Sequence, residues 1–256
     1  MPDEEDAAYR QLDLALQDAL TPVRQFPGEV SVLFSGGVDS SLLAHALAAD
    51  RTVGLFTIAA AGAEELAVAQ RAAELLGIRW ASKSLDRRQI ERAIDRWGTL
   101  LPRPWTPEWE ANLTVLLAAD LAPAPMVVVG QGADELFLGY DRYRRVSEAE
   151  RRRQSEDDLA RARSVTKGVV GPLVDKIGKS LVAPYLAEPF IRAVRSIPWE
   201  AHAPGALTKP VLRSWAARRG LPLAVISRPK RAIQYSTGTH HWFRERAQPV
   251  RRPGAR

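Results

Sequence analysis

Two glycine-rich stretches of the chain hold residues that can do chemistry. The first follows the apolar run Val30–Phe34 and reads Ser35-Gly36-Gly37-Val38-Asp39-Ser40. A loop of this kind between a strand and a helix offers free backbone N–H groups, and glycine lets a ligand come close. Serine hydroxyls can donate to phosphate oxygens, whereas Asp39 suits phosphate only with a magnesium ion between them. We therefore expect a pyrophosphate and magnesium site. The alternative is that the stretch is only a tight strand-to-helix turn without a ligand.

The second stretch has the same design. The run Met126–Val129 leads into Gly130-Gln131-Gly132-Ala133-Asp134-Glu135. Asp134 then stands where Asp39 stands, at the end of a strand and the start of a helix. Two carboxylates at neighbouring strand ends can share one magnesium ion. The alternative is that the acidic pair only complements a helix dipole.

The periodicity of the chain supplies the elements that must position these loops. Four apolar runs are expected to be strands: Val30–Phe34, Thr52–Ile58, Arg79–Leu85 and Met126–Val129. Helical patterns alternate with them: Asp6–Leu20, Ser41–Ala49, Ala63–Leu76, Gln89–Trp97 and Pro107–Leu121. Alternation with short links predicts an α/β fold with a mainly parallel sheet. Gly77 is the expected stop of the third helix.

The chain changes character after about residue 145, where no further strand is expected and Glu148–Arg163 reads as a charged helix. We divide it into an N-terminal helix packed on the core (1–25), an α/β nucleotide-binding core (26–145), a helical part that completes the domain (146–247) and a frayed tail (248–256).

Composition narrows the class of protein. The chain has no cysteine, which excludes a disulfide scaffold, a cysteine zinc site and thiol chemistry. The net charge is +6 and arginines occur in clusters, which we interpret as a solvated surface, with an RNA-binding face as the alternative. No apolar run is long enough for a membrane span, and the N-terminus is acidic where a secretory signal would be basic. We expect a cytoplasmic protein without a membrane partner.

The first glycine-rich stretch resembles the signature of the ATP pyrophosphatases, the PP-loop superfamily. The second, from Gly130 to Tyr140, resembles the Ser-Gly-Glu-Gly-Ala-Asp-Glu-Leu-Phe-Gly-Gly-Tyr pattern of asparagine synthetases. Three later segments resemble the same family in the same order: Lys209-Pro210-Val211-Leu212-Arg213, Leu221-Pro222 and Arg228-Pro229-Lys230. The resemblance implies a parallel-sheet PP-loop domain, adenine nucleotide alpha hydrolase-like, with a helical C-terminal part and without the glutaminase domain.

The resemblance also implies roles for residues. Lys230 would stabilise charge during catalysis, and Gln131 would take the place of a glutamate that brings the nitrogen nucleophile to the adenylate. Asp39 and Asp134 would hold magnesium. The residues expected to bind ATP are Leu33, Ser35, Gly36, Gly37, Asp39, Ser40, Thr57, Ile58, Gly130 and Gly132.

The implied reaction is ligation of a carboxylate to an amine with release of AMP and pyrophosphate, in its simplest form asparagine synthesis from aspartate. Nitrogen would come from free ammonia, an amine or a separate glutaminase subunit. Two features depart from the family: Gln131 cannot act as a base, and Val182-Ala183 stand where an arginine precedes a proline motif. The alternatives are a lysidine-type tRNA ligase and an ATP-binding partner subunit without catalysis.

Overall fold

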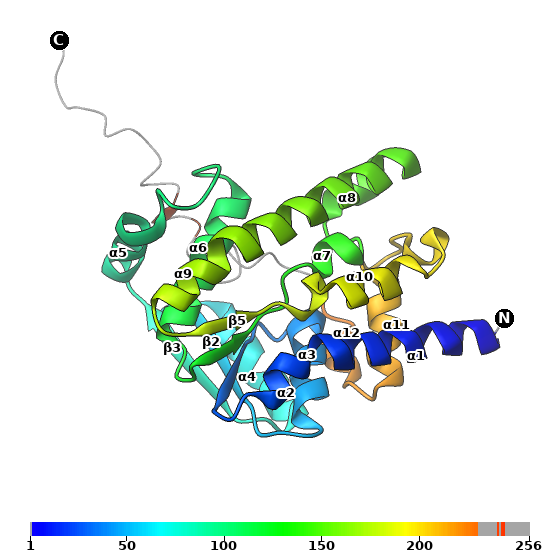
Figure 1. Cartoon of the computed structure of the whole chain (residues 1–256), viewed down its shortest axis with the longest axis horizontal. Helices are drawn as coiled ribbons and strands as arrows, with labels where there is room; N and C mark the ends of the chain where they lie inside the picture. The colour runs from blue at the N-terminus through cyan, green and yellow to red at the C-terminus, as the bar shows by residue number, and fades with distance from the viewer. Residues whose placement is uncertain (1, 230–239, 241, 244–256) are drawn as a thin grey trace, which may run out of the picture.

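A five-stranded parallel sheet forms the centre of the protein, with strand order β3-β2-β1-β4-β5 (Figure 1). The structure is a computed structural model that describes residues 2–229, 240, 242 and 243. The strands are β1 (Val30–Leu33), β2 (Gly54–Ala60), β3 (Trp80–Leu85), β4 (Met126–Val128) and β5 (Ser180–Val182). Each strand runs parallel to its neighbours, so their carboxyl ends share one edge.

Helices cover both faces of this sheet because the central strands are apolar on both sides. Val128 belongs to one hydrophobic cluster with α1, α3 and α10, while Val127 belongs to the other with α5, α6 and α9. Alternate residues of a strand thus serve opposite cores. The helices of these two layers are α1 (Pro2–Ala19), α3 (Val38–Ala48), α4 (Glu64–Leu76), α5 (Arg87–Trp97), α6 (Pro107–Leu121), α9 (Gly171–Lys176) and α10 (Glu188–Arg195).

The other helices are mostly short, and all except α2 belong to the C-terminal half. They are α2 (Thr21–Gln25), α7 (Ala133–Leu136), α8 (Glu148–Val165), α11 (Pro210–Arg218) and α12 (Leu223–Ile226). The 3-10 turns are η1 (Asp141–Arg145), η3 (Pro184–Leu186) and η4 (Trp199–His202), and η2 (Thr166–Val170) is a π-helical turn that follows α8. The N-terminal α1 packs along α10, which brings the start of the chain against its C-terminal half (Figure 1).

Local signals explain why most of these elements could be predicted. Asp86 and Gln89 form a reciprocal capping box at the start of α5, and Thr106 caps α6 through the N–H of Trp109. Gly77 ends α4 in the left-handed conformation, as expected. The predicted α/β class and parallel sheet are confirmed.

The expectation of no strand after residue 145 was wrong. β5 pairs with β4 in parallel, with Ser180 opposite Met126 and Val182 opposite Val128. Only three residues long and partly exposed, β5 carries too little apolar pattern to stand out in the sequence. The helical region assigned to 146–247 therefore also contributes an edge strand to the sheet. The predicted tail, 248–256, lies outside the described residues. None of the helices that the structure describes has the length and hydropathy needed to cross a membrane.

Candidate functional site

A cavity of about 480 Å³ opens at the carboxyl edge of the sheet, where β1, β2 and β4 end. This volume lies within the range of small-molecule sites. Most of the residues predicted to act on ATP line it: Leu33, Ser35, Gly37, Asp39, Ser40, Thr57, Ile58, Gly130, Gln131, Gly132 and Asp134. Residues from distant parts of the sequence thus meet at one place.

The first glycine-rich loop is ordered by its own hydroxyl groups. The N–H of Ser35 donates to Oγ of Ser40 at 3.3 Å, and the N–H of Gly37 donates to Oγ of Ser35 at 3.3 Å. Gly37 is the N-cap of α3, and no side chain of the described chain caps this helix start. The first N–H groups of α3 therefore remain available to an anion beside the cavity.

Gly36 lies on the side of the loop that packs on α4. It does not line the cavity, in contrast to its predicted ligand role, and its φ of 68° is a left-handed conformation that favours glycine. A Cβ atom there would lie 3.1 Å from the carbonyl oxygen of Val68 in α4. Gly36 thus permits the turn and its packing on α4.

Lys209 joins the two glycine-rich stretches. Its Nζ lies 2.5 Å from Oδ2 of Asp39 and 2.7 Å from Oδ1 of Asp134, and its side chain is only 1 % exposed. Burial opposes the charge of this ammonium, but attraction to Asp134 and Asp39 outweighs burial and raises the pKa of Lys209. Asp39 and Asp134 thus lie close together at the sheet edge, as their positions at the strand ends predict. The third member of the cluster is a lysine, Lys209.

The cluster depends on an unusual backbone conformation at Lys209 and on the absence of a side chain at Gly139. Lys209 has φ 62° and ψ 49° immediately before Pro210, a conformation disfavoured for a residue that precedes proline. A Cβ on Gly139 would lie 2.0 Å from Oδ1 of Asp134 and 2.3 Å from Cε of Lys209. Only glycine at position 139 leaves room for this ion pair.

The donor set of the cluster is compatible with magnesium bound through nucleotide phosphates. Oδ1 of Asp39 is buried and accepts no hydrogen bond within the described part of the chain. No group of three or more histidine, cysteine or acidic side chains forms a complete metal site among the described residues. Magnesium commonly uses one or two carboxylates and completes its shell with phosphate and water oxygens, which is what Asp39 and Asp134 offer.

The side chain of Gln131 is held on both sides. Its Nε2 donates to Oδ1 of Asn112 at 2.9 Å, and its Oε1 accepts from the hydroxyl of Thr166 at 3.3 Å. Asn112 comes from α6 and Thr166 from the π-helical turn, an irregularity common at functional sites. Gln131 thus lies fixed in the cavity wall.

The remaining predicted residues are of three kinds. The hydroxyl of Thr57 donates to the carbonyl of Phe34 at 2.6 Å and accepts from Nε1 of Trp80 at 2.8 Å, so it ties strand ends together. Leu33 and Ile58 give this end of the cavity an apolar surface. Lys230 lies outside the described residues. Arg228, which the structure does describe, donates to the carbonyl of Ser35 at 2.9 Å and so contacts the first glycine-rich loop.

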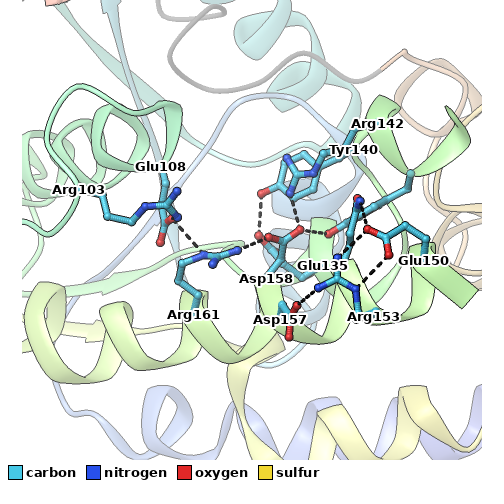
Figure 2. A network of polar contacts seen from close by, with 12 residues as sticks. Arg103, Glu108, Glu135, Tyr140, Arg142, Glu150, Arg153, Asp157, Asp158 and Arg161 are labelled. Carbon is cyan, nitrogen blue, oxygen red and sulfur yellow. Dashed lines mark hydrogen bonds and ion pairs between the residues drawn. The ribbon is translucent and has the colours of Figure 1, made fainter. Parts of the chain in front are cut away.

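A network of charged side chains runs along α8 (Figure 2), and some of its members, Asp158 and Arg161 among them, line the cavity. Asp158 accepts from the hydroxyl of Tyr143 at 2.6 Å, from Arg161 at 2.5 Å and from Arg142. Arg161 also lies 3.3 Å from Glu108 of α6. Sequence reasoning missed this network, and it missed the position of Lys209, which stood out only as part of the asparagine synthetase resemblance.

Comparison with known proteins identifies the family of the chain. A profile of the asparagine synthase family matches residues 11–182 and 178–253. A provisionally assigned glutamine-hydrolysing asparagine synthetase of Methanocaldococcus jannaschii is 25% identical over 91% of this chain and 50% of its own length. A similar protein of Mycobacterium bovis is 29% identical over 56% of this chain and 22% of its own length. The chain thus spans half or less of the curated relatives it matches.

Two solved structures are also similar to parts of this chain. NMN synthetase from Francisella tularensis is 12% identical with a TM-score of 0.48, covering 90% of this chain and 76% of that one. A tRNA methyltransferase subunit of Methanocaldococcus jannaschii is 23% identical with a TM-score of 0.38, covering 66% and 75%.

Proposed function

Because the chain belongs to the asparagine synthase family, we propose that it is an ATP-dependent carboxylate–amine ligase that forms AMP and pyrophosphate. In its simplest form the reaction makes asparagine from aspartate and ammonia. The family and the fold support an ATP-using enzyme; the substrate and the site of ATP cleavage are the proposal.

One observation carries this proposal. Asp39 and Asp134, 95 positions apart, converge within 2.7 Å of one buried ammonium beside an uncapped helix start. A polyphosphate placed there would meet free N–H groups of α3 and the cation of Lys209, while the carboxylates would serve magnesium. Magnesium would supply charge neutralisation of the phosphates, with Asp39 and Asp134 as its protein ligands.

The proposed chemistry has two steps. A carboxylate oxygen of the substrate bonds to the α-phosphorus of ATP. The bond from the α-phosphorus to the oxygen that bridges to the β-phosphate breaks, and pyrophosphate leaves. The amine then bonds to the activated carbonyl carbon, AMP leaves, and the amine loses a proton. Lys209 and the α3 N–H groups would stabilise charge on the departing pyrophosphate, which is the main catalytic aid such a site gives. Lys230 is the proposed second cation.

The nitrogen step places a demand on Gln131. An amide cannot take the proton that the amine must lose. Nε2 of Gln131 donates to Asn112 and its Oε1 accepts from Thr166. In this proposal the side chain so held would orient the nucleophile. We propose that the proton passes to solvent, and that ammonia arrives free or from a separate glutaminase.

Pyrophosphate release tests the proposal. ATP and magnesium are incubated with each of a panel of amino acids and ammonia, and Asp39→Ala serves as the control. Release with aspartate that is lost in the variant, with asparagine and AMP as products, supports the proposal. Release with another carboxylate keeps the mechanism and changes the substrate. ATP binding without release for any substrate favours the partner-subunit alternative.

The tRNA-ligase alternative depends on the arginine clusters, and most arginines of the described clusters form ion pairs with acidic side chains. Arg145 lies 2.5 Å from Asp141, and Arg153 lies 2.7 Å from Glu150 and 3.0 Å from Asp157. Arg218 and Arg219 pair with acids of α1, Asp6 and Asp13. Pairing leaves less free charge for a phosphate backbone, which favours the small-molecule proposal. Salt-dependent filter binding with tRNA distinguishes the two.

A further inference from the structure

The ammonium of Lys209 occupies the space between the two carboxylates that are proposed to bind magnesium. Its Nζ lies 2.5 Å from Oδ2 of Asp39 and 2.7 Å from Oδ1 of Asp134, and its side chain is 1% exposed. The proposed function gives this ammonium another task, because it assigns Lys209 to the pyrophosphate and the carboxylates to magnesium. One ammonium group cannot bridge both aspartates and also leave them to a metal ion. Magnesium can therefore reach both carboxylates only after the ammonium has moved.

We propose that Lys209 is an internal counter-ion that keeps magnesium off Asp39 and Asp134 until ATP arrives. When magnesium and ATP bind together, the metal ion takes the two carboxylates and the ammonium of Lys209 moves to the phosphates. This inference rests on the proposed function for its ATP and magnesium site, but it does not depend on the carboxylate substrate. The exchange makes the binding of metal ion and nucleotide mutually dependent.

The charges of the cluster give the reason why magnesium alone is excluded. Two carboxylates at −1 each and one ammonium at +1 leave a net charge of −1, so an added magnesium ion would turn it to +1. The metal ion and the ammonium would compete for the same oxygens and would repel each other, and such repulsion is strong where solvent is scarce. The phosphates of ATP bring several negative charges and give the ammonium a new partner, which removes both obstacles.

The surroundings of Lys209 allow the exchange. Lys209 lines the cavity, so its ammonium can move toward the phosphate site without crossing the core. Oδ1 of Asp39 is buried and accepts no hydrogen bond from any residue that the structure describes, so one oxygen is available to the metal ion before the ammonium leaves. The uncapped start of α3, which contains Asp39, offers its N–H groups to the same phosphates. Phosphate and ammonium can thus meet beside the carboxylates.

The backbone at Lys209 is suited to a movement of this side chain. Its φ of 62° and ψ of 49°, immediately before Pro210, form a strained conformation, and strain of this kind is typical of sites that switch between two states. The contacts with Asp39 and Asp134 help to hold this conformation in the free protein. Because their loss to magnesium lets the backbone relax, the strain offsets part of the cost of moving the ammonium.

Manganese provides the test, because Mn²⁺ suits the same oxygen ligands as Mg²⁺ and its EPR signal distinguishes bound from free ion. Mn²⁺ is titrated into the full chain without nucleotide and again with saturating α,β-methylene-ATP, and a titration of the analogue without protein gives the background. The wild type should bind Mn²⁺ at least about a hundred-fold more weakly without the nucleotide, since the ion must then break two hydrogen bonds between charged groups. Equal affinities in the two titrations would overturn the inference.

Two variants remove the ammonium. Lys209→Met keeps the length of the side chain and should bind Mn²⁺ without nucleotide about ten- to a hundred-fold more tightly than the wild type, the effect of one hydrogen bond to a charged group. Lys209→Gln, a neutral polar replacement, should show the same gain and serves as the second variant should the first not fold. Lys83→Met, at an exposed lysine of β3, is the matched control and should bind Mn²⁺ as the wild type does. Unchanged affinity in both Lys209 variants would contradict the exchange.

A third variant shows where the metal ion lies once the nucleotide has bound. With α,β-methylene-ATP present, Asp39→Asn should weaken Mn²⁺ binding at least about ten-fold, since even second-shell partners of a metal ion contribute that much. Unchanged affinity would leave the metal ion on the phosphates alone and would likewise overturn the inference. If neither Lys209 variant folds, the wild type and Asp39→Asn decide the question.

These titrations separate the inference from the proposed function, because none of them requires a carboxylate or an amine. Tight binding of Mn²⁺ by the wild type without nucleotide overturns the exchange even if pyrophosphate is released. Absence of pyrophosphate release with every substrate counts against the proposed function, and the metal affinities of the wild type and the Lys209 variants then still decide the exchange.

Discussion

Nζ of Lys209 lies 2.5 Å from Oδ2 of Asp39, a contact between residues 170 positions apart that closes the candidate site. Asp134 completes the arrangement at 2.7 Å. One buried cation thereby holds together the two strand ends whose carboxylates are proposed to bind magnesium. The relationship makes Lys209 part of both the stability and the chemistry of the site.

Removing the ammonium should expose the repulsion between the two carboxylates. Lys209→Met is expected to lower the free energy of unfolding by about 3–5 kcal/mol, because it leaves partly buried charges without their partner. Millimolar magnesium should restore part of this loss if the carboxylates can share the ion. Urea unfolding with and without magnesium measures both effects. Lys83→Met, at an exposed lysine of β3, is the control, and equal stabilities of the two variants would contradict the account.

The space at Gly139 gives a second prediction. Gly139→Ala places a Cβ against Oδ1 of Asp134 and Cε of Lys209, so the ion pair must open. We expect about 1–3 kcal/mol of destabilisation, as for other overpacked sites, with loss of ATP binding. Gly168→Ala, where a Cβ meets nothing within 4 Å, should change neither. Thermal unfolding and nucleotide titration provide the comparison, and normal ATP affinity in Gly139→Ala would be the contrary result.

The contacts of Asp158 with Tyr143, Arg142 and Arg161 predict a dependence of stability on pH. Burial opposes the charge of Asp158, but hydrogen bonds from Tyr143 and Arg142 outweigh burial and lower its pKa in the folded state. A carboxylate in the unfolded chain has a pKa of about 3.9. The stabilisation is therefore fully present above that value and is lost as pH falls through the lower folded pKa.

Asp158→Asn should accordingly cost about 1.5–3 kcal/mol at pH 7, and the difference from wild type should shrink below about pH 4. Urea unfolding from pH 3 to 7 measures it. Asp157→Asn, one position earlier and 58% exposed, should have little effect at any pH. A gap for Asp158→Asn that is constant across this range would show that its ionisation does not contribute.

Gln131 separates the two proposed steps. Gln131→Glu supplies a carboxylate that can accept the proton of the attacking amine, and general bases contribute roughly a hundred-fold or more. We expect the rate of amide formation with ammonia to rise at least about ten-fold, while pyrophosphate release in the absence of ammonia stays near the wild-type rate. Single-turnover measurement of both products checks this. Parallel changes in the two rates would place Gln131 in the first step instead.

The loops could be predicted because their signals are local. A strand, two glycines and a serine–aspartate pair lie within eleven residues, and the second stretch repeats the arrangement. Parallel strands then bring both loops to one edge, so the meeting of Asp39 and Asp134 followed from topology.

Other parts of the site leave little trace in the sequence. Lys209 is an ordinary lysine before a proline, and its burial depends on the space at Gly139 and on a backbone conformation that no propensity favours. Arg161 and Asp158 belong to a helix, α8, whose many charges are typical of a solvated surface. Only the tertiary fold shows that one side of α8 faces the cavity. β5 is too short for periodicity to reveal it.

The central claim is that a substrate carboxylate attacks the α-phosphorus of ATP at the edge held by Asp39, Asp134 and Lys209. The most direct measurement uses aspartate labelled with ¹⁸O in its side-chain carboxylate, with ATP, magnesium and ammonia, and follows the label by mass spectrometry. The account predicts one ¹⁸O atom in the phosphate of each AMP formed with asparagine. Unlabelled AMP, or ADP and phosphate as the products of ATP, would contradict it.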